Sequence, residues 1–386
     1  MNLNIKQVKD QLIKELNQLK TPQGFLLAGF PHFNKLFGRD SLIVSWQLLN
    51  YDVEIVKNTL EILSKFQGVA VSEMSEEEPG KILHEHIIGF DKHSKGNWPF
   101  PYYGSIDSTL LYLILFYFYF NKTKDADFIK QFWANIEKAV DWILNYGDRD
   151  NDLFIEYKNK NPNGLYNQGW KDSNFIKSKL PIAIVEVQGY EYFALVKISE
   201  LIKVLNINKE FLDVLKERAD KLQEKFNQNF WMDDKKYFAL GLDGDKKQIK
   251  YITSNPGHLL FTEIVDNDKI DYIVKKLFSE ELWTEYGIRT HSIYEENFNP
   301  LSYHLGSIWP HDNWIIAQGL KKLNYLEEYN RIKSALLNAF KTIGYLPEYY
   351  GVINNEIKLE NLEKTPDYPQ AWSSGALLNF ILEDEK

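Results

Sequence analysis

Cysteine is absent from all 386 residues of this sequence, and its absence excludes whole classes of chemistry. Without a thiol the chain has no disulfide, no thiolate nucleophile and no cysteine-ligated metal. No apolar run reaches the length of a membrane span, and residues 110–120 are interrupted by tyrosines. The amino terminus lacks the apolar segment of a secretory signal. We therefore expect a cytoplasmic protein with no membrane partner.

Several sequence signatures are missing as well. The chain has no G-x-G-x-x-G or phosphate-binding loop, no G-x-S-x-G nucleophile elbow and no histidine-rich iron or zinc motif. His304, His311 and Asp312 are close in sequence, but their spacing does not match that of metal ligands on one helix face. The formal net charge of −9 argues against an extended surface for nucleic acids. The sequence thus predicts no metal, no cofactor and no nucleic-acid partner.

Aromatic residues, by contrast, are abundant, with 10 Trp, 23 Tyr and 24 Phe. Many lie in polar loops, such as Trp98-Pro-Phe-Pro-Tyr-Tyr103, Trp170 and Trp309. Rings beside amides and acids form walls on which flat polar ligands such as pyranose sugars stack. The alternative is that these rings bury the loops against the core. As a group they favour a pocket for a carbohydrate substrate.

Helical periodicity dominates the sequence. Its apolar stripes predict helices over residues 4–19, 40–49, 53–67, 106–120, 126–146, 181–204, 208–228, 254–263, 268–279, 302–322, 325–342 and 370–383. Helices with few charges alternate with helices that carry charge and one apolar stripe. Paired as six helical hairpins, they predict an all-α (α/α)6 toroid, in which an outer ring of helices wraps an inner ring. Residues 153–157 and 237–240 are expected to form short local β-ribbons in the loops.

No linker, charge block or low-complexity stretch divides the chain. We therefore expect a single catalytic domain over residues 1–386, with a leading helix within residues 1–20. In such a toroid the loops that precede the inner helices gather at one mouth. Those loops carry nearly all of the unusual polar residues.

One of these loops isolates a single carboxylate among aromatic and amide side chains, in Gly164-Leu-Tyr-Asn-Gln-Gly-Trp-Lys-Asp-Ser173. A carboxyl group beside aromatic rings is poorly solvated when charged, so its pKa rises and Asp172 can donate a proton near neutral pH. Glu348, held between Pro347 and two tyrosines, is the natural second carboxylate. Sugar-cleaving enzymes use such a pair. The alternative for Asp172 is a surface turn that caps the following helix.

Other loops offer candidate binding residues. Arg39 and Asp40 begin a helix and could hold two hydroxyls of one sugar, or they could form a helix cap with a neighbouring ion pair. Asp107 precedes a very apolar helix and is either a ligand or a cap. Glu186 lies early in an apolar helix, so we expect it to have a partner at the mouth. The candidate substrate-binding residues are Phe37, Arg39, Asp40, His84, Glu85, Tyr103, Asp107, Trp170, Lys171, Gln188, Tyr303, His304, Trp309, His311, Asp312 and Trp372.

Nine motifs follow one another in an order that is typical of a known family. They are Ala28-Gly-Phe-Pro31, Leu36-Phe-Gly-Arg-Asp-Ser-Leu42, Gly80-Lys-Ile-Leu-His-Glu85, Tyr102-Tyr-Gly-Ser-Ile-Asp107, Asn167-Gln-Gly-Trp-Lys-Asp-Ser173, Glu186-Val-Gln-Gly-Tyr190, Ser254-Asn-Pro-Gly-His258, residues 299–313 and Leu346-Pro-Glu348. From about residue 24 to its end, the chain resembles the glucosidase domain of bacterial and archaeal glycogen-debranching proteins, the amylo-α-1,6-glucosidase family.

The resemblance implies a six-hairpin α/α barrel that cleaves a terminal α-glycosidic bond with inversion. It also implies that Asp172 is the general acid, that Glu348 is the general base, and that Arg39 and Asp40 hold the terminal sugar's hydroxyls. An inverting enzyme needs a water between sugar and base, so the two carboxyl groups are expected roughly 6.5–9.5 Å apart.

The sequence departs from that family in two places. The motifs begin without the amino-terminal region that debranching enzymes carry ahead of the barrel, and His86-Ile-Ile-Gly89 replaces a segment that usually contains Arg and Glu. Docking on a glycogen branch usually needs additional surface. We therefore expect a short oligosaccharide or a small glycoside as the substrate.

Hydrolysis of mannosylglycerate or glucosylglycerate is the main alternative, because hydrolases of these compounds are also short barrels. Their substrate carries a carboxylate and needs a cationic clamp. The chain has five arginines, and Arg149 and Arg218 lie in segments that are typical of solvated helices. Arg289 or Lys171 would then have to bind the carboxylate. A non-catalytic sugar-binding barrel is a remote alternative, since it would need neither Asp172 nor Glu348. No feature of the sequence specifies an oligomeric state.

Overall fold

A computed structural model of the protein describes residues 4–88 and 98–385. The described residues do not include residues 1–3 of the predicted leading segment, and they also do not include Gly89 or Lys386. The α-helices are α1 (Ile5–Leu19), α2 (Gly38–Leu48), α3 (Val53–Lys65), α4 (Ser108–Thr123), α5 (Ala126–Gln131), α6 (Trp133–Trp142), α7 (Val185–Leu205), α8 (Phe211–Asn229), α9 (Asn267–Leu277), α10 (Pro310–Lys322), α11 (Leu326–Ile343) and α12 (Ala371–Asp384). A π-helical turn, η1 (Ile143–Gly147), and a 3-10 helix, η2 (Asn255–Phe261), complete the helical elements of the described residues.

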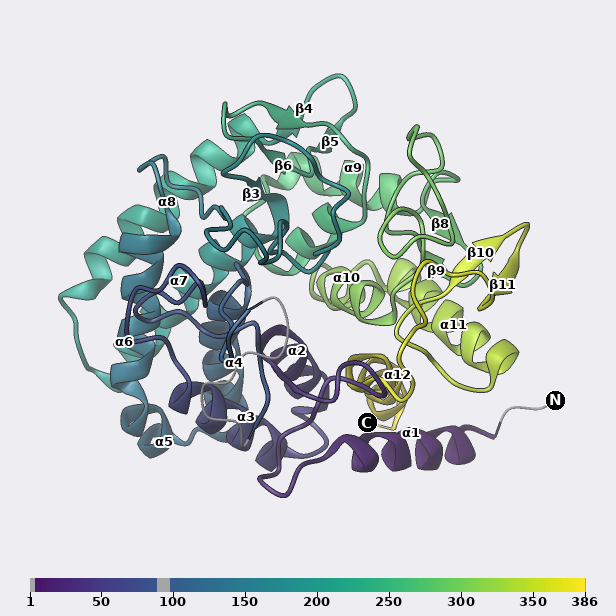
Figure 1. Cartoon of the computed structure of the whole chain (residues 1–386), viewed down its shortest axis with the longest axis horizontal. Helices are drawn as coiled ribbons and strands as arrows, with labels where there is room; N and C mark the ends of the chain where they lie inside the picture. Colours follow the sequence, from purple (N-terminus) through teal and green to yellow (C-terminus); the bar gives the residue numbers. More distant parts are fainter. Residues whose placement is uncertain (1–3, 89–97, 386) are drawn as a thin grey trace.

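Six helical segments form a closed inner ring. In turn, α2 contacts α4, α4 contacts α7, α7 contacts η2, η2 contacts α10, α10 contacts α12, and α12 contacts α2. The remaining helices pack outside this ring, with α8 against α7, α11 against α10 and α3 against α2 and α4. Figure 1 shows α2, α10 and α12 near the middle of the molecule and α5, α8 and α11 at its periphery. The predicted toroid of inner and outer helices is confirmed.

Burial explains which helices are inner. Residues 108–116 of α4 and residues 371–381 of α12 are buried without interruption, as expected for helices covered on all sides. The outer helix α8 instead buries a single stripe that includes Leu215, Ala219, Leu222 and Phe226. The contrast in charge that distinguishes the two kinds of helix in the sequence therefore follows from their two environments.

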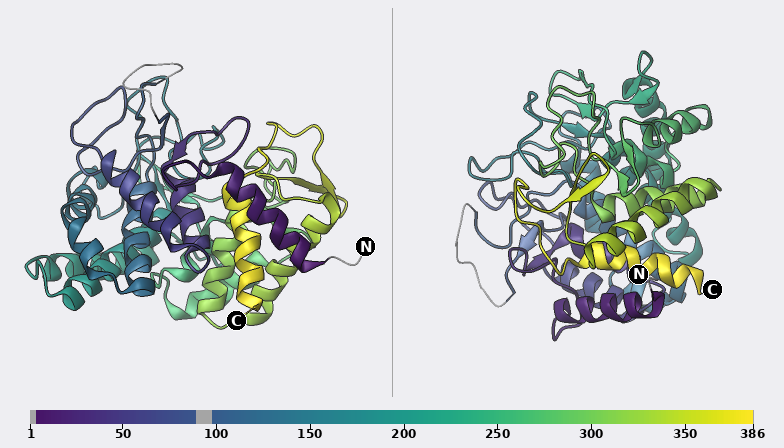
Figure 2. Two further views of the ribbon diagram at one scale, coloured as in Figure 1. Left: turned by 90° about the horizontal axis from the view of Figure 1, so that it is seen from below. Right: turned by 90° about the vertical axis from the view of Figure 1, so that its right-hand side faces the viewer.

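The leading helix α1 packs against α12, and so joins the first described helix of the chain to the last. Figure 2 shows α1 alongside α12, and it also shows long loops projecting from one end of the helical ring. Among the described residues, no helix is both long and apolar enough to cross a membrane. The organisation of residues 1–386 as one domain stays a prediction.

Several predicted helix boundaries are wrong. The helix expected over 126–146 is divided into α5, α6 and η1. The helix expected over 302–322 begins only at Pro310, because Trp309 is extended and residues 302–308 form a loop. The segment expected over 254–263 is the tighter helix η2, which has Pro256 in its first turn and Gly257 against Ile316 of α10. Residues 302–308 are apolar or buried as in a helix, but they form a loop.

The strands are short and lie in the loops at the mouth and between helices. They are β1 (Leu36–Phe37), β2 (Glu85–His86), β3 (Ala183–Ile184), β4 (Trp231–Met232), β5 (Tyr237–Phe238), β6 (Gly241–Leu242), β7 (Gln248–Ile249), β8 (Trp283–Thr284), β9 (Gly287–Ile288), β10 (Gly351–Ile353) and β11 (Glu356–Lys358). All of their pairings are antiparallel: β1 with β2, β3 with β6, β6 with β7, β4 with β5, β8 with β9 and β10 with β11.

One predicted ribbon is confirmed and the other is wrong. Residues 237–238 pair with residues 231–232 as expected of a local ribbon. Residues 153–157 form no strand, and only a single bridge joins Tyr157 to Ile182. In β1 and β2, Phe37 lies opposite Glu85, so that this ribbon brings together two candidate binding residues that are 48 positions apart in sequence.

Candidate active site

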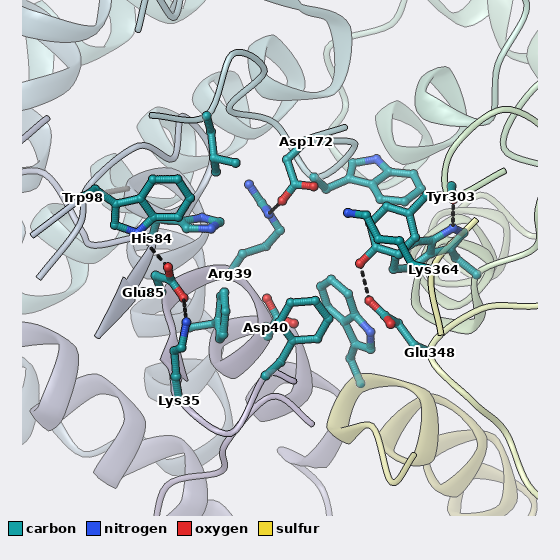
Figure 3. Close-up of a pocket in the computed structure, with 16 residues that line it drawn as sticks. Lys35, Arg39, Asp40, His84, Glu85, Trp98, Asp172, Tyr303, Glu348 and Lys364 are labelled. Carbon is teal, nitrogen blue, oxygen red and sulfur yellow. Dashed lines mark hydrogen bonds and ion pairs between the residues drawn. The ribbon is translucent and has the colours of Figure 1, made fainter. Parts of the chain in front are cut away.

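A pocket with a volume of about 230 Å³ opens among the loops that precede the inner helices. A second hollow, of about 320 Å³, shares Phe33, Tyr303, Glu348 and Lys364 with it. Figure 3 shows Asp172, Glu348 and Asp40 approaching the pocket from three different sides, with Asp172 at the top and Glu348 at the lower right of the view. The lining residues are Phe33, Lys35, Phe37, Arg39, Asp40, His84, Glu85, Trp98, Leu165, Trp170, Asp172, Tyr303, Trp309, Glu348, Lys364 and Trp372.

The start of α2 forms one side of the pocket. The backbone N–H of Gly38 donates to the carbonyl oxygen of His84 at 2.9 Å. A Cβ atom at position 38 would lie 2.1 Å from the carbonyl oxygen of Leu83, so only glycine allows this close approach. The approach places Arg39 and Asp40, the first side chains of α2, beside the ribbon of β1 and β2. The Gly-Arg-Asp motif therefore encodes both the helix start and its packing.

Arg39 is held by an ion pair that leaves little of its guanidinium free. Its Nε donates to Oδ2 of Asp107 at 2.7 Å, and its Nη2 donates to the carbonyl oxygen of Gln168 at 3.2 Å. Burial alone would lower the pKa of Arg39, but Asp107 raises it above its ordinary value. The two alternatives for Asp107 are therefore resolved: its carboxylate makes no helix cap and holds Arg39 instead.

Asp172 has the environment of a general acid. Its side chain is about one quarter exposed, and Oδ2 lies 3.9 Å from Nη1 of Arg39. Burial raises the pKa of Asp172, while the positive charges of Arg39 and Lys364 oppose that shift. A raised pKa keeps a proton on the carboxyl group at higher pH, which is what a proton donor requires.

Glu348 is almost completely buried, with 2% of its surface exposed. Tyr303 donates its hydroxyl proton to Oε1, and the backbone N–H of Asp367 donates to Oε2 at 3.1 Å. The backbone N–H of Glu348 in turn donates to the carbonyl oxygen of Asp367 at 2.9 Å. Burial raises the pKa of Glu348 to about 8, although the hydrogen bond from Tyr303 opposes the shift.

The pH dependence of activity should respond to Tyr303. A general base must be ionised, and the hydrogen bond from Tyr303 favours the ionised form of Glu348. Tyr303→Phe should therefore raise the pKa of Glu348 further and move the acidic limb of kcat/KM to higher pH, by about one to two units for a charge-assisted hydrogen bond. The measurement is kcat/KM from pH 5 to 10.

Tyr325→Phe is the matched control for this experiment, because Tyr325 donates to Asp271 at an exposed position. It should leave the profile unchanged. A Tyr303→Phe enzyme whose activity falls by the same factor at every pH would show that the hydroxyl does not act through the ionisation of Glu348.

Asp40 provides a third carboxyl group inside the pocket. It is 6% exposed, and burial raises its pKa to about 7 while Arg39 opposes the shift. Opposite it, Glu85 accepts hydrogen bonds from Lys35 Nζ at 2.7 Å and from Trp98 Nε1 at 2.8 Å. Burial lowers the pKa of His84 well below its ordinary value, so this ring is neutral. The pocket thus offers carboxylate acceptors and a neutral imidazole, groups that suit sugar hydroxyls.

Three tryptophans form an aromatic wall. Trp170 and Trp309 meet edge to face at 5.7 Å, and Trp309 and Trp372 meet in the same way at 6.1 Å. The indole N–H of Trp309 donates to the carbonyl oxygen of Tyr303. Those of Trp170 and Trp372 are buried without a partner among the described residues. Buried donors of this kind are usually satisfied, so a ligand or a water suits these two positions.

The other predicted binding residues lie behind the pocket wall and do not line it. They are Tyr103, Asp107, Lys171, Gln188, His304, His311 and Asp312. Gln188 bonds the backbone of Ile155 on both sides, accepting from its N–H and donating to its carbonyl oxygen. Asp312 accepts a hydrogen bond from Nε2 of His258 at 2.8 Å.

Glu186 has the partner that was expected, because Asn255 at the start of η2 donates a hydrogen bond to it; Glu186 does not line the pocket, and burial raises its pKa to about 7. Two expectations for arginines are corrected. Arg218, expected on a solvated face, is buried and donates to Glu191 and Asp148. Arg289, one of the two cations proposed as a carboxylate clamp, donates to backbone carbonyl oxygens and does not line the pocket.

Sequence analysis missed five lining residues as site candidates: Phe33, Lys35, Trp98, Leu165 and Lys364. Trp98 belongs to the aromatic loop that the sequence had marked as a stacking segment. Lys364 lies in the polar stretch 360–367, where no local pattern distinguishes it from a surface lysine.

One group of acidic side chains in the described residues is compact enough for a cation: Asp148, Asp150 and Asp152. The ammonium of Lys246 already lies 2.8 Å from Asp150 and 2.6 Å from Asp152, and Arg218 binds Asp148. The positive charge that this loop requires therefore comes from the chain itself.

Comparison with known proteins gives a family match and a set of similar structures. A family model described as the mannosylglycerate hydrolase MGH1-like glycoside hydrolase domain matches residues 111–368, about two thirds of the chain. No curated protein sequence matches this chain significantly.

The similar structures include two of the GH63 mannosylglycerate hydrolase from Thermus thermophilus. The complex with Tris has a TM-score of 0.75 at 11% identity and covers 97% of this chain and 100% of that chain. The complex with Tris and D-glycerate has a TM-score of 0.73 at 11% identity with the same coverage. A rhamnosidase from Klebsiella oxytoca with rhamnose bound has a TM-score of 0.67 at 11% identity and covers 98% of this chain and 64% of that chain. At these identities the similarity shows a shared fold.

Proposed function

We propose that this chain, which belongs to the mannosylglycerate hydrolase MGH1-like family of glycoside hydrolases, releases one sugar from a small glycoside whose aglycone carries a carboxylate. Mannosylglycerate and glucosylglycerate are substrates of this kind. The chain is a glycoside hydrolase, and water is therefore its second substrate. The proposed stereochemical course is inversion, with Asp172 as general acid and Glu348 as general base.

We choose an anionic aglycone because of the position of Lys364. It lines the pocket, and among the described residues its ammonium has no hydrogen-bond or ion-pair partner. The ammonium lies 3.9 Å from the centre of the Tyr303 ring. Its charge also acts on the pKa of Asp172, which places it near the group that protonates the leaving oxygen. The Lys364 side chain is exposed, so its ammonium is hydrated and free to form an ion pair with a carboxylate on the aglycone.

Lys35, the other lysine of the pocket, is already bound to Glu85. Lys171, which the sequence offered as a clamp, is buried and donates to Thr290 and Ser254. Both are therefore poorer candidates for binding the substrate's carboxylate. Lys364 is therefore the residue proposed to bind the substrate's carboxylate, in place of Lys171 and Arg289.

Hydrolysis of α-1,6-linked oligosaccharides, the interpretation that the sequence favoured, is the second candidate. The ordered motifs support it, and the paired carboxylates serve either reaction. The family model that matches is the mannosylglycerate hydrolase MGH1-like glycoside hydrolase domain, so the order of the two candidates is reversed. A cytoplasmic location remains part of the proposal.

A substrate screen tests this proposal. The purified protein is assayed for sugar release from mannosylglycerate, glucosylglycerate, isomaltose, panose and maltotriose. We expect kcat/KM to be highest for one of the glycerate glycosides. Lys364→Met should lower that value by about 10- to 100-fold, the contribution of one charge-assisted hydrogen bond, and should have little effect on the methyl ester of the same glycoside.

Lys358→Met is the matched control, because Lys358 pairs with Glu356 on the exposed ribbon of β10 and β11. It should leave every rate unchanged. Release of glucose from the oligosaccharides alone would overturn the proposal in favour of the second candidate. If Lys364→Met lowered kcat/KM equally for the glycoside with a free carboxylate and for its methyl ester, Lys364 would not be the residue that binds the carboxylate.

A further inference from the structure

The two catalytic carboxyls are connected through one loop, which runs from β9 to α10 over residues 289–309. At its far end Tyr303 donates to Glu348. The next residue, His304, contacts Ser173, the residue that follows Asp172. Near its start, the carbonyl oxygen of Thr290 accepts from Lys171, the residue that precedes Asp172.

Asp172 itself lies in irregular backbone, so its position depends on these neighbours. The ammonium of Lys171 donates to Thr290 at 2.6 Å and to Ser254, just before η2, at 3.2 Å. Both the hydroxyl of Ser173, at 2.8 Å, and its backbone N–H, at 3.4 Å, are directed at Nδ1 of His304. The acid is therefore anchored to one loop on both of its sides.

Burying a lysine and a histidine to fix a loop costs free energy of desolvation. Lys171 is 3% exposed and His304 is 1% exposed. Neither lines the pocket. Apolar side chains could fill the same space without the cost of burying charge or an imidazole. What these two residues add is a directional bond on each side of Asp172.

We propose that Lys171 and His304 are positioning residues that, through the loop of residues 289–309, set the place of the general acid relative to the general base. The carboxyl separation decides whether a water fits between sugar and base, and thus whether inversion can proceed. Tyr303 and His304 are adjacent in sequence, and their rings are 4.4 Å apart. A displacement of His304 should therefore also displace Tyr303, which bonds Glu348. This inference rests on the roles proposed above for Asp172 and Glu348.

The test compares two substrates of one sugar that differ in their need for an acid. His304→Phe should lower kcat on the preferred glycoside by about 100-fold, the typical cost of misplacing a catalytic group by roughly 1 Å, with KM nearly unchanged. The corresponding α-glycosyl fluoride needs little protonation of its leaving group, so its hydrolysis should fall far less. His304→Gln, whose amide oxygen can still accept from Ser173, should recover most of the activity. Lys171→Met should behave as His304→Phe does.

Tyr112→Phe is the control, because Tyr112 is buried in α4 and bonds Ser64, outside the loop of residues 289–309. Unfolding temperatures of all variants separate loss of fold from loss of position. Equal losses on glycoside and fluoride, in variants that remain folded, would overturn the inference. If Asp172→Asn retained full activity, the acid assignment of the proposed function would fail instead.

Discussion

Asp172→Asn is expected to lower kcat on an ordinary glycoside by about 10²- to 10⁴-fold, the usual contribution of a general acid. Asparagine keeps the shape of the side chain but carries no acidic proton. Burial raises the pKa of Asp172 against the opposing charges of Arg39 and Lys364, so the native carboxyl retains its proton to higher pH than an exposed aspartate. The measurement is steady-state kinetics on the best substrate of the screen.

Hydrolysis of the α-glycosyl fluoride should suffer much less from the same substitution, because fluoride leaves with little protonation. Asp127→Asn, at an exposed position on α5, is the control and should have no effect on either substrate. A loss of equal size on the glycoside and the fluoride would contradict the assignment of Asp172 as the acid.

Glu348→Gln should have the other large effect. The amide matches the carboxylate in size, so sugar binding should be nearly intact while turnover is abolished. Tyr303 can still donate to the amide oxygen, but the amide cannot accept a proton from the attacking water. Added azide should restore part of the reaction and give a β-glycosyl azide from an α-linked substrate, because a small anion can occupy the position of that water.

The stereochemistry of the native reaction is the check on both roles. NMR spectra recorded before mutarotation should show the β-anomer as the first product from an α-glycoside. Glu217→Gln, at an exposed position on α8 where Glu217 pairs with Lys221, serves as a control for a Glu–Gln exchange. The α-anomer as first product would indicate retention and a covalent intermediate. The roles proposed for Asp172 and Glu348 would then both be wrong.

The pocket also shows why its two carboxyls differ. Glu348 is buried with 2% of its surface exposed, whereas the side chain of Asp172 is 25% exposed. Glu348 receives hydrogen bonds from Tyr303 and the backbone of Asp367, and Asp172 lies against Arg39. A second hollow, lined in part by Phe33, Tyr303, Glu348 and Lys364, adjoins the same wall. Glu348 is thus fixed by donors, while Asp172 is held in place through its neighbours in sequence.

The sequence by itself determined the architecture and the two candidate carboxyls. Apolar periodicity is a local property, and the contrast between charged and uncharged helices follows directly from burial, so the toroid was predictable. Asp172 beside Trp170 and Glu348 beside Pro347 were also recognisable locally, because both carry their aromatic or constrained surroundings in the adjacent residues. Burial raises the pKa of Asp172, in the direction expected from its aromatic neighbours, whereas the rise in the pKa of Glu348 to about 8 was not predicted from the sequence.

Only the tertiary structure decided which polar residues reach the pocket. Lys171 is adjacent to the acid in sequence yet is directed away from the pocket to Thr290, whereas Lys364 reaches the pocket from a stretch without a recognisable pattern. The partners of Arg39, Tyr303 and His304 lie 68, 45 and 131 positions away in the chain. A side chain's direction depends on the packing of its loop against distant segments, and that packing is set by the closed ring of helices rather than by neighbouring residues.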